Sequence, residues 1–319
     1  MAKYRNNLPQ LAGDLFLTDG GIETTLIFHD GFDLPEFAAF DILKQAEGIA
    51  ALRRYFKTYA RIAQENEVGF ILESPTWRTS SGWGDKIGYT AEGLANANRQ
   101  AIALLEDIRF EHETEKSKMV ISGCIGPHGD GYVIGETLTP AEAEAYHAVQ
   151  IATFQDTQAD MVTAITMTYA EEAIGVARAA KAAGLPVVIS FTVETNGRLP
   201  SGQTLKDAIE QVDEATNAAP VYYMINCAHP THFEDVLAAD EAWTKRIGGL
   251  RANASKMSHA ELDEAEELDD GNPVELGQHY HELQQKLGNL KVMGGCCGTD
   301  HRHIEAIAKA CAAKPELVA

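Results

Sequence analysis

The sequence predicts an α/β protein built as a single (β/α)8 TIM barrel, and two observations carry that prediction. Short apolar runs bounded by Gly, Pro or Asn recur along all 319 residues, each too short for an ordinary helix and too apolar for an exposed strand. Ala-rich amphipathic stretches separate these runs. About eight strand and helix alternations over this length favour a closed barrel over an open doubly wound sheet.

The apolar runs are the expected strands. The first of them, followed by TDGGIETTL, has no G-x-G-x-x-G pattern, which argues against a dinucleotide-binding sheet. In chain order the runs are LFLTDGG (15–21), GFILESPTW (69–77), VISGCIGP (120–127), DMVTAITM (160–167), PVVISFTVE (186–194), VYYMINCAHP (221–230), IGGLRANAS (247–255) and KVMGGCCGTD (291–300).

The stretches between the runs are the expected helices, with clear examples at 46–67, 91–115, 140–159 and 170–184. Thr139 followed by Pro140 is typical of a helix start, whereas Gly184 before a proline is typical of a helix end.

Two loops are longer than a barrel requires. Residues 27–45 extend the first loop, and residues 253–273 extend the seventh, with seven acidic residues between 261 and 270. The acidic segment is expected to be a solvated, mobile loop, with a lid as the alternative. With no interdomain linker visible, residues 1–319 are expected to form one domain.

Charge and composition narrow the partners. Asp and Glu number 47 against 26 Lys and Arg, a net charge of −21, which disfavours nucleic acid and anionic membranes. No window approaches about 18 consecutive apolar residues, and the N-terminal stretch lacks a secretory signal. We therefore expect a cytoplasmic enzyme that acts on small molecules. Five cysteines are too few for a secreted disulfide framework.

Polar side chains at the carboxyl ends of barrel strands form the active site in this fold. Three cysteines, Cys227, Cys296 and Cys297, are expected to meet there, because loops after the sixth and eighth strands can touch across the seventh. The polar residues at these strand ends are Asp19, Glu73, Cys124, Thr166, Glu194, Asn226, Cys227, Cys296 and Cys297.

Three thiolates at one point repel one another unless a cation joins them, and tetrahedral Zn²⁺ suits such a set. Three protein ligands leave the fourth position open, as in catalytic sites. Gly294, Gly295 and Gly298 are expected to let the adjacent cysteines face one ion through backbone conformations that other residues resist. The alternatives are cysteines that serve as small buried hydrophobes, and a vicinal disulfide, which geometry disfavours.

A zinc site with three thiolates has a formal charge of −1 and activates water poorly. It suits a substrate thiol, which it would hold as a thiolate at neutral pH. The expected reaction is attack of that sulfur on an electrophilic carbon, with Cys227, Cys296 and Cys297 as the catalytic metal ligands.

The segments INCAHP (225–230) and MGGCCGTD (293–300), with LTDGGIETTL (17–26) near the start, resemble the homocysteine S-methyltransferase family, which includes betaine-homocysteine and S-methylmethionine-homocysteine methyltransferases. The resemblance covers essentially the whole chain. It implies a (β/α)8 barrel whose three cysteines bind zinc, and methyl transfer to the thiol of homocysteine, which forms methionine and places the chain in methionine biosynthesis.

The resemblance also implies substrate contacts near the first two strands. Asp19 and the backbone amides of Gly20, Gly21 and Ile22 would hold the polar end of the amino acid, since an Asp suits an ammonium and amides suit a carboxylate. Helix capping is the alternative for Asp19. Trp77 would lie near the methyl donor, where its face attracts a sulfonium or quaternary ammonium; barrel packing is the alternative.

One position departs from the family pattern. After the fourth strand the family has a Glu-Thr pair whose Glu contacts the substrate's amino group, whereas this chain has Ile165 and Thr166. Glu194 is the expected replacement, and Asn226 is expected to join the substrate-binding residues.

The remaining cysteines and histidines have weaker claims. Cys124 and Cys311 are expected to be packing residues, and His301 and His303 to cap or border the last helix. His229 and His232 follow Cys227 closely enough to be minor candidates for substrate contact.

Three functions remain open at this point. The first is a stand-alone zinc thiol methyltransferase with a sulfonium or ammonium donor. The second is the thiol-acceptor component of a corrinoid-dependent system, which would need a separate corrinoid protein because the chain lacks a D-x-H-x-x-G motif. The third is a catalytically diverged zinc-binding member of the family.

Overall fold

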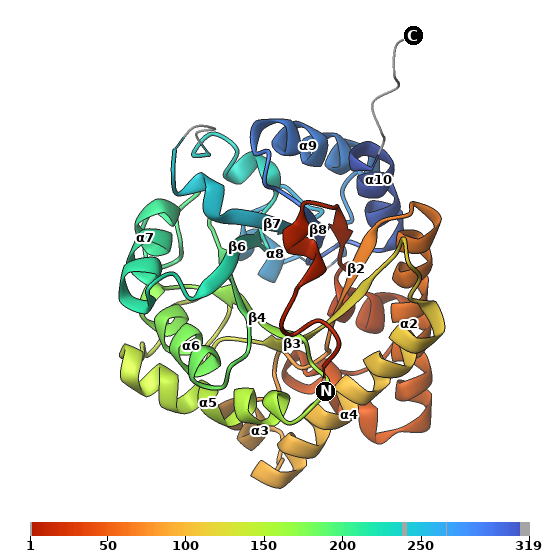
Figure 1. Cartoon of the computed structure of the whole chain (residues 1–319), viewed down its shortest axis with the longest axis vertical. Coiled ribbons are helices and arrows are strands. Elements are labelled where there is room, and N and C mark those ends of the chain that lie inside the picture. Colours follow the sequence, from red (N-terminus) through yellow and green to blue (C-terminus); the bar gives the residue numbers. More distant parts are fainter. Residues whose placement is uncertain (1, 238–240, 266, 313–319) are drawn as a thin grey trace.

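Eight parallel strands close into a barrel in the computed structural model, which describes residues 2–237, 241–265 and 267–312. The strands follow chain order around the barrel, and β8 closes it by pairing with β1 (Figure 1). All eight predicted strands are confirmed. They are β1 (Phe16–Leu17), β2 (Gly69–Glu73), β3 (Met119–Ile125), β4 (Met161–Met167), β5 (Val187–Thr192), β6 (Pro220–Asn226), β7 (Ile247–Ala252) and β8 (Val292–Gly295).

Helices surround the strands (Figure 1), and in the described residues none is long and apolar enough to cross a lipid bilayer. The longer ones are α2 (Ala46–Glu65), α4 (Ala91–His112), α5 (Pro140–Gln155), α6 (Ala170–Ala182), α7 (Leu205–Thr216), α9 (Pro273–Lys286) and α10 (His301–Cys311). Three short helices are α1 (Ile22–Thr24), α3 (Ser81–Lys86) and α8 (His259–Asp263).

The connection from β6 to β7 departs from the predicted alternation. Its described residues form only two 3₁₀ turns, Pro230–His232 and Thr244–Arg246, so the expectation of a helix in every unit is wrong here. Phe233, Leu237 and Trp243 are buried and anchor this irregular segment against the core. Apolar anchoring therefore replaces helical packing in the sixth unit.

Local sequence signals set the helix ends as predicted. Thr139 and Glu142 form a capping box at the start of α5, with Pro140 in the first turn. Gly184, just after α6, has φ +67°, a left-handed conformation that glycine adopts without strain.

The interior of the barrel changes character along its axis. The amino-terminal layers are apolar, with Phe16, Ile71, Val120 and Val188 packed together, and Leu8 of the N-terminal segment joins them. The carboxyl-terminal layers carry buried polar groups such as Glu73 and Arg251. Apolar side chains thus fill the amino-terminal end of the barrel, and the polar groups lie at the carboxyl-terminal end, where active sites of this fold are found.

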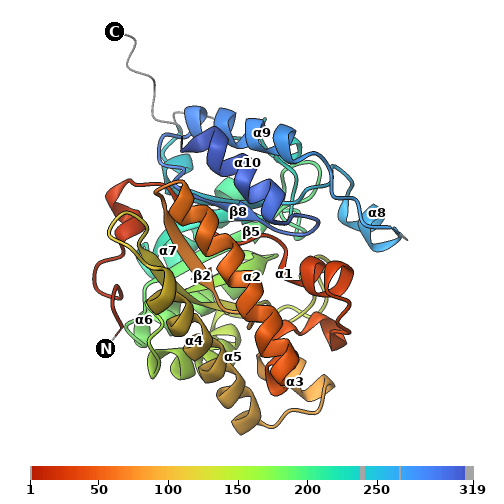
Figure 2. The same ribbon diagram turned by 90° about the vertical axis from the view of Figure 1, so that its right-hand side faces the viewer.

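The two long loops fold more than the sequence suggested. In the first, Phe40 and Leu43 are buried against the outer core, so this loop belongs to the packed structure. In the acidic segment, Ser258 caps α8, Asp269 accepts a hydrogen bond from Ser255, and Asp270 pairs with Arg302. Glu266 lies outside the described residues. Figure 2 shows α1, α3 and α8 towards one end of the barrel.

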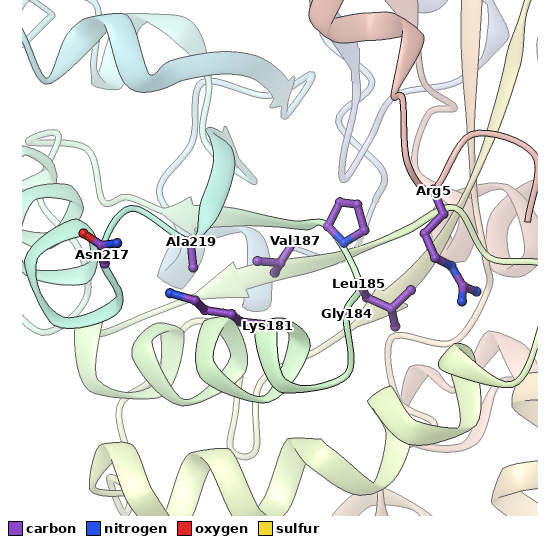
Figure 3. A pocket seen from close by; sticks show the side chains of 8 residues that line it. Arg5, Lys181, Gly184, Leu185, Val187, Asn217 and Ala219 are labelled. Carbon is purple, nitrogen blue, oxygen red and sulfur yellow. The ribbon is translucent and has the colours of Figure 1, made fainter.

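A surface hollow of about 320 Å³ lies at the amino-terminal end of the barrel, between the starts of β5 and β6 (Figure 3). Its lining includes Arg5, Lys181, Val187 and Ala219. These residues lie at the opposite end of the strands from the cysteines, so we assign this hollow no part in the chemistry.

A buried ion pair near this amino-terminal end gives a stability prediction. Arg109 donates to Asp160 at 2.7 Å, and both side chains are buried. Replacing Arg109 with Met leaves a buried carboxylate without its cation, and we expect unfolding free energy to fall by about 3–5 kcal/mol. Arg53 pairs with Asp107 at the surface, and Arg53→Met is expected to cost at most about 1 kcal/mol. Urea unfolding of both variants measures the difference, and equal losses would contradict the assignment.

Candidate metal and substrate site

Three cysteine sulfurs meet at the carboxyl-terminal end of the barrel. Cys227 directly follows β6, and Cys296 and Cys297 directly follow β8, with β7 between them. Their Sγ atoms all lie within 4.8 Å of one another. In the described part of the chain, this is the group of three or more His, Cys, Asp or Glu side chains placed to hold a metal ion.

Two of the three sulfurs are bonded in this structure. A disulfide joins Cys227 to Cys296, and Cys297 is free. The sequence did not predict this bond, although the disfavoured vicinal pairing of Cys296 with Cys297 is indeed not formed. A set of three thiolates requires this disulfide to be reduced.

Two of the three glycines around the cysteines are needed because neighbouring atoms leave no room for a side chain, and one is needed for its backbone conformation. A Cβ on Gly294 would lie 1.8 Å from Thr18 Oγ1, and one on Gly295 would lie 2.0 Å from Thr299 Oγ1. Gly298 has φ +77°, as predicted. Gly298 therefore has a backbone conformation of the predicted kind, while Gly294 and Gly295 are needed because neighbouring side chains pack against their backbone.

Cys227 is held by its backbone. Its φ of +53° lies in the left-handed region, which a residue with a side chain occupies at a cost. Its amide donates to Arg251 O at 3.0 Å, and its carbonyl accepts from Asn253 Nδ2 at 3.1 Å. These bonds aim the sulfur at the loop after β8.

Two residues that sequence reasoning missed cover the sulfurs. Tyr132 Oη lies 3.4 Å from the Sγ atoms of both Cys227 and Cys297. The His259 ring lies 4.6 Å from the Tyr132 ring, and its Nε2 contacts Cys227 O. Tyr132 lies in the loop after β3 and His259 begins α8, and the sequence around neither residue carries a signal for this position. Glu194, the expected amino-group contact, lies 3.2 Å from His259 Nδ1.

Asp19 has partners within the protein. Tyr55 Oη donates to it at 2.8 Å, and Arg251 lies 2.9 Å from its other oxygen. Burial raises the pKa of Asp19, and the nearby Arg251 opposes that rise. Arg251 also donates to Gly295 O at 3.1 Å and Gly20 O at 3.3 Å. A charged residue inside the apolar run IGGLRANAS was the available signal for Arg251.

The turn after β1 supports the cysteine loop. The amide of Gly21 donates to the carbonyl of Thr299 at 3.0 Å, with the Thr299 hydroxyl 3.1 Å away. Gly20 O accepts from Tyr55, and Ile22 begins α1. The Gly21 amide expected to bind a carboxylate is therefore engaged internally.

Asn226 also has internal partners. Its Oδ1 accepts from Ser190 Oγ at 2.6 Å and from the amide of Thr166 at 3.0 Å, and its Nδ2 donates to Thr166 Oγ1 at 3.0 Å. Thr166 has φ +66°. Asn226 thus fixes the turn at the end of β4, and these bonds use its Oδ1 and one of the two N–H groups of its Nδ2.

Trp77 contacts Ile165, the residue at which this chain departs from the family pattern. Its Nε1 donates to Ile165 O at 3.3 Å, and Ile165 is buried. The Arg78 guanidinium lies 3.8 Å from the centre of the Trp77 ring. One face of the indole therefore already holds a cation, which reduces its capacity for a cationic methyl donor.

Two glutamates near the mouth hold protons unusually well. Burial raises the pKa of Glu73 to about 7; its Oε1 accepts from Thr163 at 2.9 Å, and its Oε2 has no hydrogen-bond partner. Burial, with a smaller contribution from Asp19, also raises the pKa of Glu23 to about 7. Glu23 was not predicted, although a carboxylate four residues after Asp19 was visible in the sequence.

The weaker candidates lie around this centre. Cys124 is buried and Cys311 is half-buried on α10. His303 completes the capping box with Asp300, whereas His301 is exposed. His229 is buried beside Thr231, and His232 contacts Lys256 O.

Comparison with known proteins adds to this geometry. Residues 16–311 match the protein family described as Homocysteine S-methyltransferase. The chain belongs to this family. The resemblance inferred from the sequence motifs is confirmed.

Solved structures similar to this homocysteine S-methyltransferase family member share its fold. The oxidized form of the homocysteine methyltransferase MmuM from Escherichia coli is 17% identical, with a TM-score of 0.76, over 96% of this chain and 99% of that one. The metallated form of MmuM is 17% identical, with a TM-score of 0.75, over 95% of this chain and 99% of that one. At this identity the likeness establishes the barrel.

The buried Glu73 gives a pH prediction. Its folded pKa of about 7 exceeds the ordinary 4.5 of a glutamate, so the stability it contributes is complete below about pH 4.5 and is lost as pH rises through about 7. Glu73→Gln lacks this loss. We expect the stability of the variant relative to the unmodified protein to rise by on the order of 3 kcal/mol between pH 5 and 8.

Urea unfolding at several pH values measures this change. Glu115→Gln, at an exposed position, is the matched control for removing one carboxylate. A stability difference for Glu73→Gln that stays constant with pH would contradict the assignment.

Proposed function

We propose that the chain is a zinc-dependent methyltransferase that moves a methyl group from a sulfonium or ammonium donor to the thiol of homocysteine or a related thiol, forming methionine in the first case. The single observation that carries this proposal is the meeting of Cys227, Cys296 and Cys297 at the carboxyl-terminal mouth of the barrel. Membership of the homocysteine S-methyltransferase family supports it.

The three cysteines fit a zinc ion by donor chemistry and by their meeting at one point. Bonds of about 2.3 Å in a tetrahedral site place the sulfurs about 3.8 Å apart, and these sulfurs lie within 4.8 Å of one another. The bond between Cys227 and Cys296 must first be reduced. Zinc bound there would hold a substrate thiol as a thiolate at neutral pH.

The chain's own residues would orient and shield that sulfur. Tyr132 borders the sulfurs through its hydroxyl, and His259 and Asn253 hold the Cys227 carbonyl. The reaction is a displacement at the methyl carbon. An electron pair of the substrate sulfur forms the new S–C bond, the bond from the donor atom to that carbon breaks, and the donor leaves with its electron pair as a neutral sulfide or amine. The thiol proton goes to solvent.

Two acidic side chains are available for the amino group of an amino-acid acceptor, since Ile165 cannot provide that contact. Glu194 is engaged by His259. Glu23 has no ion-pair partner within 4.0 Å among the described residues, and its charge raises the pKa of the Cys297 thiol in addition to the larger effect of burial. We therefore place the ammonium of the acceptor at Glu23, with Glu194 as the alternative.

The metal prediction uses the cysteines directly. In the reduced protein, Cys227→Ser, Cys296→Ser and Cys297→Ser are each expected to lower bound zinc from about one ion per chain to a small fraction, and to abolish methionine formation, because each removes a thiolate ligand. Metal analysis and a donor panel of S-methylmethionine, S-adenosylmethionine, betaine and methylcobalamin test this.

Cys311→Ser is the matched control, because Cys311 lies on α10 outside the sulfur cluster. An active, zinc-free Cys296→Ser variant would refute the proposal. Transfer from methylcobalamin alone would place the chain in a corrinoid-dependent system.

The acceptor prediction separates the two glutamates. Glu23→Gln is expected to raise KM for homocysteine by about tenfold and to leave KM for 4-sulfanylbutanoate, which lacks an ammonium, unchanged, since only the first loses a charge-assisted hydrogen bond. Glu194→Gln serves as the paired variant in the same steady-state assay. If Glu194→Gln alone shows the homocysteine-specific rise, the ammonium belongs at Glu194.

A further inference from the structure

Arg78 is a buried cation that lacks an anionic partner in the described structure. The residue is 4% exposed, and it follows β2 by five positions. No carboxylate of the described residues lies within ion-pair distance of its guanidinium. Its Nε has no hydrogen-bond partner, and its Nη1 makes a long contact of 3.4 Å to Gly129 O.

Two tryptophans occupy the flat faces of this guanidinium. Its carbon lies 3.8 Å from the Trp77 ring centre and 3.4 Å from the Trp83 ring centre. Stacking of this kind offsets part of the cost of burial. It leaves the edge of the guanidinium, where the N–H groups lie, to other partners. That edge matches the two oxygens of a carboxylate.

Stacking between the two tryptophans does not fully offset the cost of burying the Arg78 charge. Burial lowers the pKa of Arg78 to about 10, although Asp130 and Tyr132 oppose this effect. A buried charge without a paired counter-ion is expensive, and a side chain kept in that state is a candidate for ligand binding.

Arg78 lies close to the sulfur cluster. Its Nη1 contacts Gly129, and Tyr132 in the same loop contacts the sulfurs of Cys227 and Cys297. Three residues of chain span at most roughly 11 Å between Cα atoms. Arg78 and the cysteine sulfurs therefore border the same short loop, and Tyr132 of that loop also acts electrostatically on Arg78.

Two other groups that could bind a carboxylate here, the Gly21 amide and Arg251, are already engaged. The amide of Gly21 is bonded to Thr299, and Arg251 is paired with Asp19. Lys86 is largely exposed and lies over the Trp83 ring. The strongly acidic chain, with a net charge of −21, also makes a local cation important for holding any anion.

We propose that Arg78 binds the carboxylate of a substrate, so that the enzyme selects thiols or donors bearing a carboxylate at a fixed distance from the reacting atom. This inference rests on the proposed function for the identity of the reacting atom. The other role for Arg78, packing between two indoles, would not distinguish ligands with a carboxylate from ligands without one.

Calorimetry on the reduced, zinc-loaded protein tests the inference without turnover. Three thiols are compared: homocysteine, 4-sulfanylbutanoate, which lacks the ammonium, and 3-aminopropane-1-thiol, which lacks the carboxylate. Arg78→Gln is expected to weaken binding of the first two by about 10- to 100-fold and to leave the third unchanged. Arg99→Gln, an exposed arginine on α4, is the matched control and should bind all three as the unmodified protein does.

A second variant and measurements on the unmodified protein keep the test valid if Arg78→Gln fails to fold. Arg78→Lys keeps the charge but loses the planar fork, and should give an intermediate loss for carboxylated thiols only. In the unmodified protein, the carboxylated thiols should bind at least about tenfold more tightly than the aminothiol. Circular dichroism and zinc content confirm that each variant is folded.

A donor arm identifies which substrate carries the carboxylate. KM for betaine is compared with KM for tetramethylammonium, which lacks a carboxylate. A rise in Arg78→Gln confined to betaine, with thiol binding unchanged, places the carboxylate on the donor and also supports the inference.

The overturning results are equally specific. Equal affinity of the unmodified protein for thiols with and without a carboxylate, together with no betaine-specific change, would overturn the inference. Equal weakening of all three thiols in folded Arg78→Gln protein would indicate packing alone, with the same consequence. If carboxylate-dependent binding is found but no donor supports methyl transfer, the proposed function fails and the inference about Arg78 stands.

Discussion

The contact between Arg251 and Asp19 is the interaction on which the arrangement of this site depends. Arg251 projects from β7 and contacts two segments that are far from it in the sequence. It reaches the turn after β1 through the Asp19 carboxylate and the Gly20 carbonyl, and it reaches β8 through the Gly295 carbonyl. Both charges are buried, and each would be costly without the other. Because one guanidinium contacts both segments, the turn after β1 and the end of β8 keep fixed positions relative to β7.

Close backbone packing also fixes the positions of the segments that carry the cysteines. The Gly21 amide bonds to Thr299, Gly294 and Gly295 leave no room for side chains, and Cys227 adopts a left-handed conformation held by hydrogen bonds at both its amide and its carbonyl. The positions of the sulfurs thus come from the backbone, and the cysteines need few contacts of their own. Such an arrangement is compatible with two chemical states of the same atoms, one with a disulfide and one with free thiols.

Two glutamates and one arginine that is unpaired among the described residues lie near the carboxyl-terminal end of the barrel. Desolvation raises the pKa values of Glu23, which is partly buried, and of Glu73, which is buried, to about 7. Arg78 lies between two indoles without a carboxylate beside it in the described structure. In an acidic chain, a cation in this position can select a substrate group where the surface would repel it.

The barrel, its strands and the three clustered cysteines could be predicted from the sequence. Those features follow from periodicity, from turn and cap residues, and from the rule that barrel chemistry lies at the carboxyl ends of strands. The sequence did not predict that the described residues between β6 and β7 form only 3₁₀ turns, where buried Phe233 and Trp243 anchor an irregular chain. Tertiary structure alone decided which polar groups are engaged, as it did for Asp19, Asn226 and the Gly21 amide. It also decided which are left without partners, as it did for Arg78. The physical reason is that hydrogen-bond partners and burial depend on side chains brought together from distant segments, and a single sequence does not encode those pairings locally.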